Sequence, residues 1–151
     1  MAVYYSFYIE CYQEQDAVRI HDKLRAWTTE VHGREISMAR VLVEPEGELW
    51  YVYANPKGPG YSPFGYGEGL NEPETVALLE DRLYELIASE VGIRRALCGY
   101  EAQDVFRSGG DNLLDLEDLD VHNLVFDRNL KPQREGVMEL GSLYYRTRRR
   151  S

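Results

Sequence analysis

The order in which hydrophobic periodicities follow one another constrains the fold of this chain more than any other feature. Residues 3–12 alternate apolar and more polar side chains, which is the pattern of a half-buried β-strand. Apolar side chains then recur every three or four positions over 14–30 and 71–91, which predicts two helices. The remaining predicted strands span residues 35–44, 48–54 and 121–126. The expected order is therefore strand, helix, strand, strand, helix, strand.

Turn and cap residues support these boundaries. Pro45 and Gly47 stand between the second and third strands, where a tight hairpin turn favours both residue types. Before the second helix, Asn71 is a good N-cap and Pro73 suits the first turn. The stretch 93–98 is expected to form a further helical turn after that helix.

This order predicts an α+β fold: a two-layer sandwich with a ferredoxin-like βαββαβ antiparallel sheet and both helices on one face. The β-prone stretch 137–145 is a candidate extra C-terminal strand at the edge. The chain of 151 residues is long enough for one domain with a substantial core. We expect a single domain over 1–145 and a basic, flexible tail over 146–151.

The charge of the chain is unevenly distributed. Its net charge is −9, but four of its 17 basic residues lie among the last six positions. Residues 1–145 therefore carry 13 basic and 26 acidic groups, a net charge of −13. Such a body repels phosphate backbones and attracts basic surfaces, so it disfavours nucleic acid and favours a basic protein partner.

Other features indicate a cytoplasmic protein without membrane contact. No apolar run approaches the roughly 18 residues of a membrane span, and the N-terminus lacks the pattern of a secretion signal. Cys11 and Cys98 are far apart and have no CxxC spacing, so a reduced pair is expected.

No motif for catalysis or for a cofactor is present. The glycine-rich stretch 55–70 lacks a P-loop pattern, and Leu70 stands where a dinucleotide-binding loop needs its last glycine. The acidic stretch 111–120 fails the EF-hand pattern. Cys98 and His122 would form a nucleophile–base pair only if Cys98 escaped the expected helix C-terminus, where the dipole raises a thiol pKa. We expect no cofactor and no metal, and a function in binding rather than catalysis.

Two surfaces are candidates for that binding. The first is the acidic stretch together with two possible aromatic anchors: Asp111, Asp115, Glu117, Asp118, Asp120, Tyr100 and Tyr66. The second is the sheet face opposite the helices, which would expose tyrosines that mark an interface or are covered by other parts of the protein: Tyr4, Tyr8, Tyr12, Tyr51 and Tyr53.

One stretch resembles a known class of protein. Ala96-Leu97-Cys98-Gly99-Tyr100-Glu101-Ala102, the acidic stretch, and then Asp120-Val121-His122-Asn123-Leu124-Val125-Phe126-Asp127 resemble the C-terminal half of bacterial immunity proteins of contact-dependent and polymorphic toxin systems. Asn123 stands where that pattern has glycine. The resemblance implies a small cytosolic protein that binds and neutralises a cognate toxin. An acidic surface would speed its association with a basic toxin.

Two other functions remain open from the sequence. One is a small-molecule-binding or enzymatic domain with a pocket under the 55–70 loop, lined by Tyr61, Phe64, Tyr66 and a polar group such as His122. The other is a homodimer, or another oligomeric structural protein, that buries the tyrosine face.

Overall fold

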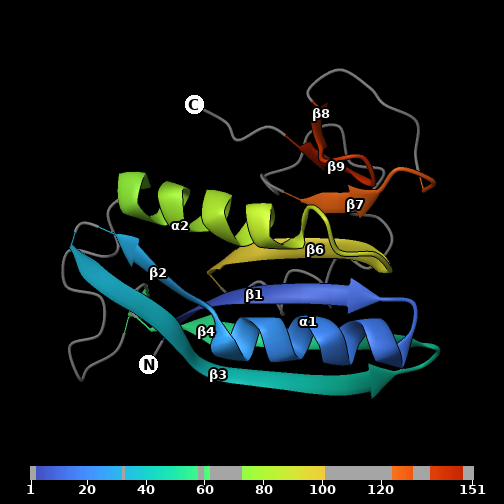
Figure 1. The fold of residues 1–151 in the computed structure, drawn as a ribbon, viewed down its shortest axis with the longest axis horizontal. Helices are drawn as coiled ribbons and strands as arrows, with labels where there is room; N and C mark the ends of the chain where they lie inside the picture. Colours follow the sequence, from blue (N-terminus) through green and yellow to red (C-terminus); the bar gives the residue numbers. More distant parts are fainter. Residues whose placement is uncertain are drawn as a thin grey trace.

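The computed structural model describes residues 3–31, 33–57, 60–61, 73–100, 124–130 and 137–147. The fold is α+β, with one antiparallel sheet and two helices, as the sequence predicts (Figure 1). In chain order the elements are β1 (Val3–Cys11), α1 (Glu14–Ala26), β2 (Thr28–Val31), β3 (Arg34–Glu46), β4 (Leu49–Pro56), β5 (Gly60–Tyr61), α2 (Pro73–Ile87), β6 (Ile93–Tyr100), β7 (Val125–Asp127), β8 (Val137–Leu140) and β9 (Tyr144–Thr147).

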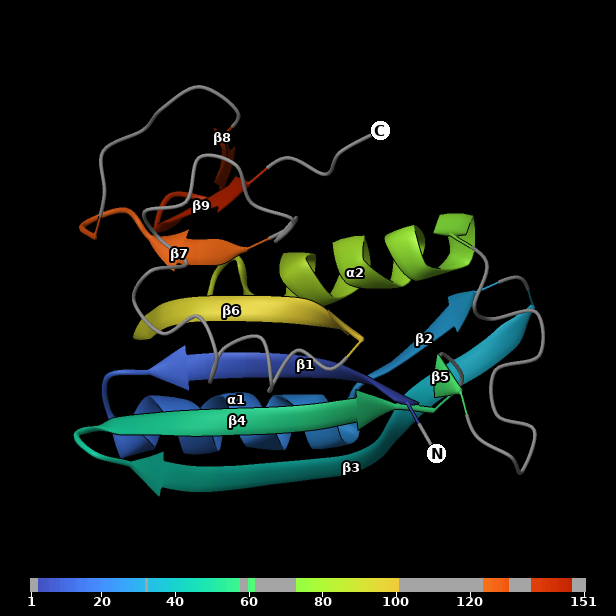
Figure 2. The ribbon, with the colours of Figure 1, turned by 180° about the vertical axis from the view of Figure 1, so that it is seen from behind.

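The described strands form a continuous path in the order β2-β3-β4-β1-β6-β7-β9-β8, and β5 pairs separately with the start of β1. Every pair in this path is antiparallel. Figure 2 shows β6, β1, β4 and β3 as the long central strands, with β3 along the lower border. The strand β1 therefore lies in the middle of the sheet, with long partners on both sides.

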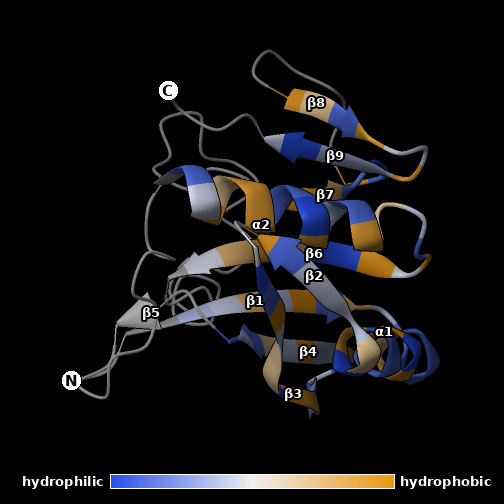
Figure 3. Ribbon diagram, turned by 60° about the vertical axis from the view of Figure 1, so that its left-hand side comes forward, coloured by the Kyte–Doolittle hydropathy of each residue, from blue (hydrophilic) through white to orange (hydrophobic). Residues whose placement is uncertain are grey.

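Both helices cover the same face of the sheet. The alternation along β1 directs Phe7 and Ile9 into the core, where neither is exposed to solvent. In α1, Ile20 and Leu24 reach this core, and α2 adds a second apolar stripe made of Leu79, Leu83, Tyr84 and Ile87. In Figure 3 the hydrophobic segments of α2 alternate with hydrophilic ones, as expected for a helix with one buried side. Neither described helix is long and apolar enough to cross a membrane.

Two segments adopt a different secondary structure from the predicted one. The first predicted helix ends at Ala26, and Thr28–Val31 instead forms β2, which pairs with Arg34–Ser37 of β3. Gly33, with a φ of 76°, makes the turn between them. The predicted helical turn at 93–98 is wrong, because these residues belong to the buried strand β6.

The C-terminal part differs in detail. The predicted single strand at 137–145 is a hairpin of β8 and β9, which turns at Gly141 with a φ of 61°. The strand β9 includes Arg146 and Thr147, two residues beyond the boundary expected at 145. Arg146 donates a 2.7 Å hydrogen bond to Asp81 and lies over the Tyr84 ring. Folded structure therefore continues into the first residues of the expected tail.

Candidate functional site

Glu10 is fully buried on the sheet face opposite the helices, and its carboxylate accepts four hydrogen bonds. Arg95 on β6 donates two of them in a forked arrangement, from Nε at 2.9 Å and from Nη2 at 2.8 Å. Tyr51 on β4 donates the third, at 2.7 Å, and Arg94 the fourth, at 2.6 Å. Three neighbouring strands of the sheet are joined through this one side chain.

A β-bulge explains how two consecutive arginines reach the same carboxylate. Glu10 pairs with Arg95 in the sheet, but Cys11 pairs with Ile93, so Arg94 is an extra residue in β6. In a regular strand, neighbouring side chains point to opposite faces, whereas a bulge redirects one of them. The sequence alone did not single out Glu10, Arg94 or Arg95.

The Glu10 carboxylate is a structural group and not a free base. Burial by itself would raise its pKa, but the hydrogen bonds from Arg95, Tyr51 and Arg94 lower the pKa below the ordinary value. A carboxylate has about four lone-pair sites, and all four are used here. Glu10 is therefore ionised at neutral pH and has no acceptor site left for a ligand.

The tyrosines of the predicted sheet-face surface fall into two groups. Tyr8 is buried; it stacks on Tyr51, with ring centroids 5.0 Å apart, and meets Tyr53 edge-on at 6.2 Å. Tyr12 lies elsewhere, just after β1, and is 38% exposed. The side chain of Tyr4 lies outside the described residues. Tyr8 is thus covered within the chain itself, and Tyr12 is the most accessible described member of this set.

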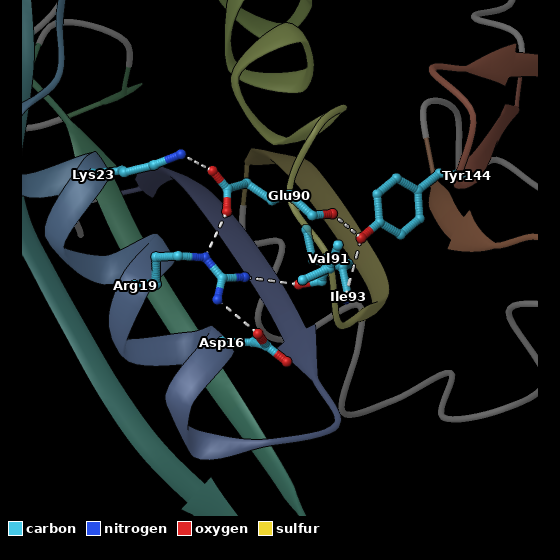
Figure 4. Close-up of polar contacts among 7 residues, drawn as sticks. All are labelled: Asp16, Arg19, Lys23, Glu90, Val91, Ile93 and Tyr144. Carbon is cyan, nitrogen blue, oxygen red and sulfur yellow. Dashed lines mark hydrogen bonds and ion pairs between the residues drawn. The ribbon is translucent and has the colours of Figure 1, made fainter.

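A second buried carboxylate, Glu90, joins α1 to the connection between α2 and β6 (Figure 4). Arg19 donates to it from Nε at 2.9 Å, and Lys23 forms an ion pair with its other oxygen. Arg19 also bonds Asp16 at 2.8 Å and the carbonyl of Val91 at 3.1 Å. Burial opposes ionisation of Glu90, but the hydrogen bonds from Lys23 and Arg19 lower its pKa below the ordinary value.

The same connection is held from its other side by β9. The Tyr144 hydroxyl donates to the carbonyl of Glu90 and accepts a 3.3 Å hydrogen bond from the Ile93 amide (Figure 4). The Tyr12 amide donates to the carbonyl of Gly92 at 3.0 Å. Residues 90–93 are therefore fixed between α1, the end of β1 and β9, and they form a firm wall for the adjacent surface.

That wall borders a cleft of about 360 Å³ at one end of the sheet. Four connections of the chain contribute its lining residues: Tyr12, Val91, Gly92, Ile93, Asp127, Arg128, Asn129, Ser142, Leu143 and Tyr144. Three of the exposed large apolar side chains gather here, since Val91 is 53%, Tyr12 38% and Leu143 36% exposed. Exposed apolar side chains that cluster in one place mark a binding surface more often than isolated ones do.

Asp127 is the acidic group of this cleft. Its carboxylate accepts a 2.9 Å hydrogen bond from the Tyr12 hydroxyl and a 3.0 Å hydrogen bond from the Asn129 amide. Among the described residues it has no ion-pair partner, because the neighbouring Arg128 pairs with Glu139 and lies over the Tyr145 ring. Two of its roughly four lone-pair sites remain for a cation.

The exposed charged residues of the described chain as a whole are mostly acidic. Of the charged residues that the structure describes as exposed, eleven are acidic and five are basic: Glu14, Asp22, Glu30, Glu35, Glu44, Glu46, Glu48, Glu74, Asp81, Glu85 and Glu139 against Lys23, Arg25, Arg34, Arg40 and Lys57. The excess of acidic residues that the composition shows is therefore also found among the exposed residues of the described chain.

Most of the first predicted surface lies outside the described residues: Asp111, Asp115, Glu117, Asp118, Asp120 and Tyr66. The backbone of Tyr100 pairs with Tyr5 at the end of β6, but its side chain is not described. The pocket expected under the 55–70 loop also lies outside, apart from the backbone of Tyr61, which forms part of β5.

The two cysteines are buried, and neither forms a disulfide. Cys98 lies in β6, not at a helix end as predicted, and its thiol donates to the Tyr5 hydroxyl at 2.9 Å. Its proposed partner His122 lies outside the described residues. Burial raises the pKa of Cys11 to about 12, so this thiol is protonated at neutral pH. Within the described ranges, no group of three or more His, Cys, Asp or Glu side chains is placed to hold a metal ion.

No family model matches the chain, and comparisons with curated proteins and with solved structures find no significant match.

Proposed function

We propose that this chain is a protein-binding domain that takes a basic partner, and that it acts as an inhibitor of the immunity type. The cleft beside β7 is the observation that carries this proposal. It combines three exposed apolar side chains with the carboxylate of Asp127, on walls that the Glu90 and Tyr144 contacts hold in place. A firm site that combines apolar side chains with a small number of polar groups is the usual form of an anchor site.

The chemistry of the cleft suits a lysine or arginine side chain of the partner. The apolar stem of such a side chain would pack against Tyr12, Val91 and Leu143, and its cationic head would meet Asp127. The excess of exposed acidic groups would attract the same partner at longer range and raise the association rate.

The resemblance of residues 96–127 to immunity proteins narrows the proposal to neutralisation of a basic toxin. In this proposal the acidic stretch 111–120, with Tyr100 and Tyr66, is a second contact region. It precedes β7 in the chain, and Asp127 is the last residue of that strand. A cytoplasmic location is part of the proposal, since two buried cysteines that form no disulfide suit a reducing compartment.

We also infer that the central part of the fold is a ferredoxin-like unit with added strands. The order β6-β1-β4-β3, with α1 between β1 and β3 in the chain and α2 between β4 and β6, supports this inference. In that view, β2 extends one edge, and β7, β9 and β8 extend the other.

Affinity capture with immobilised wild-type chain tests the proposal, followed by association kinetics with the purified partner. We expect a basic partner whose association rate falls with added salt. We expect Asp127→Lys and Val91→Glu each to weaken binding at least tenfold, because each places a charge in the anchor site. Combined reversal of Asp115, Glu117 and Asp118 should lower the association rate.

A matched control is Glu85→Arg, an exposed position on α2 outside the cleft that changes the net charge as much as Asp127→Lys does. A neutralisation assay, in which the captured partner is expressed with and without this chain, separates an inhibitor from another binding protein. Equal binding by wild type, Asp127→Lys and Val91→Glu would remove the cleft from the proposal, and an acidic partner would contradict the proposal as a whole.

A further inference from the structure

The outer edge of β3 lies outside the surfaces that the proposed function uses, and part of it has no partner among the described strands. The strand spans Arg34–Glu46, but β2 pairs only with its first four residues, Arg34–Ser37. From residue 38 to 46, β4 lies on one side of β3, and no described strand lies on the other. In Figures 1 and 2 this part of β3 forms the lower border of the sheet. An open edge of this length is a template for pairing with another strand.

The hairpin between β3 and β4 shows which backbone groups point outwards. Glu46 is paired with Leu49 across the two residues Gly47 and Glu48. The backbone N–H and C=O groups of Glu46 therefore point towards β4, as those of the first residue of a tight turn do. Outward and inward residues alternate along an antiparallel strand, so the backbone N–H and C=O groups of Val41 and Val43 face the open edge. Pro45 also faces outwards, where its missing N–H leaves no gap in the ladder with β4.

The side chains along this edge are complementary to a second copy of themselves. Arg40, Leu42 and Glu44 lie on the same sheet face, opposite Asn55, Tyr53 and Tyr51 of β4. If two copies of β3 pair in antiparallel fashion about Leu42, each Arg40 lies opposite the partner's Glu44. The two Leu42 side chains then meet on the two-fold axis. The backbone N–H and C=O groups of Leu42 point towards β4 in its own sheet, so they make no hydrogen bonds across the interface. The Leu42 pair and the two Arg40–Glu44 pairs are therefore non-hydrogen-bonded pairs, the type in which opposite side chains are closest.

The charges of this edge have no other ion-pair partners within the described part of the chain. Arg40 and Glu44 are both exposed, and neither forms an ion pair there. In the same arrangement, Val41 would exchange backbone hydrogen bonds with the partner's Val43, and both side chains lie on the helix face. The polar, apolar and backbone groups thus all match in a single register.

One exposed apolar side chain on α1 supports the same interface. Val18 is 41% exposed and lies on α1, a helix that packs mainly on β3 and β4. On the helix, Arg19 and Lys23 point towards Glu90 on the β6 side (Figure 4). At 100° per residue, Val18 lies on the opposite flank, above β3. A second copy added at β3 would bring its own α1 beside this flank and would cover Val18.

We propose that β3 pairs with β3 of a second copy of this chain, in antiparallel register about Leu42, to form a two-fold symmetric dimer with a continuous sheet. The pairing of one short strand segment and one helix flank is small compared with a standard interface, so the dimer is weak and depends on concentration. The cleft at Asp127 is lined by none of these residues, so the dimer and the proposed partner use different surfaces.

Sedimentation equilibrium with charge reversal tests this register. Wild-type chain should shift from monomer to dimer as its concentration rises, within a range of roughly 10 µM to 1 mM. Arg40→Glu and Glu44→Arg should each weaken the dimer about tenfold, because each replaces two attractive contacts with two repulsive ones. The double variant Arg40→Glu/Glu44→Arg should restore the wild-type dissociation constant to within about threefold, since the contacts are attractive again.

A cysteine at the two-fold axis gives an independent test. Leu42→Cys should form a disulfide-linked dimer under mild oxidation, because the Cα atoms of a non-hydrogen-bonded pair lie about 4.5 Å apart, within the range that a disulfide spans. Val43→Cys, on the other face and away from the axis, should not, and the native Cys11 and Cys98 are buried. Glu85→Arg serves as a charge-matched control on α2 and should leave the dimer unchanged.

Three results would overturn the proposal. If the wild-type chain stays monomeric up to about 1 mM, the dimer does not form. Arg40, Glu44 and Pro45 would then prevent the edge of β3 from pairing with another strand. A dimer that tolerates both single reversals would place its interface elsewhere. A double variant that remains as weak as the single variants, together with equal cross-linking of Leu42→Cys and Val43→Cys, would exclude this register.

Discussion

The Tyr12 hydroxyl donates a 2.9 Å hydrogen bond to the carboxylate of Asp127, a residue 115 positions further along the chain. Tyr12 follows the central strand β1, and Asp127 ends β7, so the contact joins the centre of the sheet to its C-terminal extension. Burial and this hydrogen bond raise the pKa of Tyr12 well above its ordinary value. Tyr12 is therefore a hydrogen-bond donor throughout the neutral range.

Replacement of this tyrosine separates its role in stability from its role in the cleft. Tyr12→Phe removes the hydroxyl and keeps the ring that lines the cleft. Because Tyr12 is 38% exposed and water can replace it at Asp127, we expect the free energy of unfolding to fall by about 1 kcal/mol or less. Urea unfolding followed by circular dichroism measures this change. A loss of several kcal/mol would mean that the contact supports the whole C-terminal extension.

Glu10 is expected to matter far more for stability. Glu10→Ala leaves the buried Arg95 and the mostly buried Arg94 without the carboxylate that they share. Removal of one partner of a buried ion pair typically costs about 3–5 kcal/mol, because a desolvated charge loses its counter-charge. Urea unfolding should therefore show a loss of this size, or a chain that does not fold at all.

Two variants serve as comparisons for Glu10→Ala. Glu14→Ala removes an exposed carboxylate from the start of α1 and should change stability by less than about 1 kcal/mol. Tyr51→Phe removes only one of the four hydrogen bonds to Glu10 and should lie between the two. If Glu10→Ala is as stable as Glu14→Ala, the buried cluster contributes no net stability.

The stability of the chain should fall on acidification below the ordinary carboxyl range. The pKa values of Glu10 and Glu90 are both lowered in the folded state, so the unfolded chain binds protons first as the pH falls. Their contribution is complete above the unfolded value of about 4.3 and is lost as the pH drops through the folded values. Unfolding measured between about pH 6 and pH 2 should show this decline.

A single variant identifies the source of this dependence. Glu90→Gln cannot ionise, so its unfolding free energy should start lower than that of wild type and decline less steeply with acid. Glu85, an exposed acid on α2, provides the comparison in Glu85→Gln, which should keep the wild-type slope. Equal slopes for all three proteins would show that other carboxylates control the acid transition.

Much of the fold can be predicted from the sequence where burial is one-sided. The alternation along β1 and the helical spacing in α2 report such burial directly, as Phe7 and Leu83 illustrate. The prediction fails at β6, where the bulge at Arg94 places the buried Ile93 and Ala96 three positions apart and so imitates a helix. It also fails at β2, where Trp27 and Thr28 extend the spacing of α1 although Thr28, Thr29 and Val31 favour a strand.

The cleft could be predicted only in part. Tyr12 was selected as a sheet-face aromatic, and the structure places it beside Val91, Asp127 and Leu143. These residues come from four separate parts of the chain, and no local sequence pattern indicates that they lie together. The Glu10 cluster could not be predicted from the sequence for a similar reason. Two consecutive arginines are expected to be exposed to solvent unless the bulge that directs both towards Glu10 is known. Both sites depend on tertiary contacts between distant parts of the chain.

Gly92 offers the last test, since two separate constraints act on it. Its φ of 89° lies in the left-handed region, and a Cβ at this position would lie 2.5 Å from Cγ of Asp16. Gly92→Ala must therefore both strain the backbone and displace Asp16, which bonds Arg19 in the Glu90 network. Gly47→Ala has a similar φ of 62° but open space around its Cβ, so it isolates the backbone cost of about 1 kcal/mol. We expect Gly92→Ala to destabilise the chain by at least about 2 kcal/mol in urea unfolding, clearly more than Gly47→Ala. Equal losses for the two variants would show that Asp16 moves aside freely and that the wall of the cleft is less rigid than its contacts indicate.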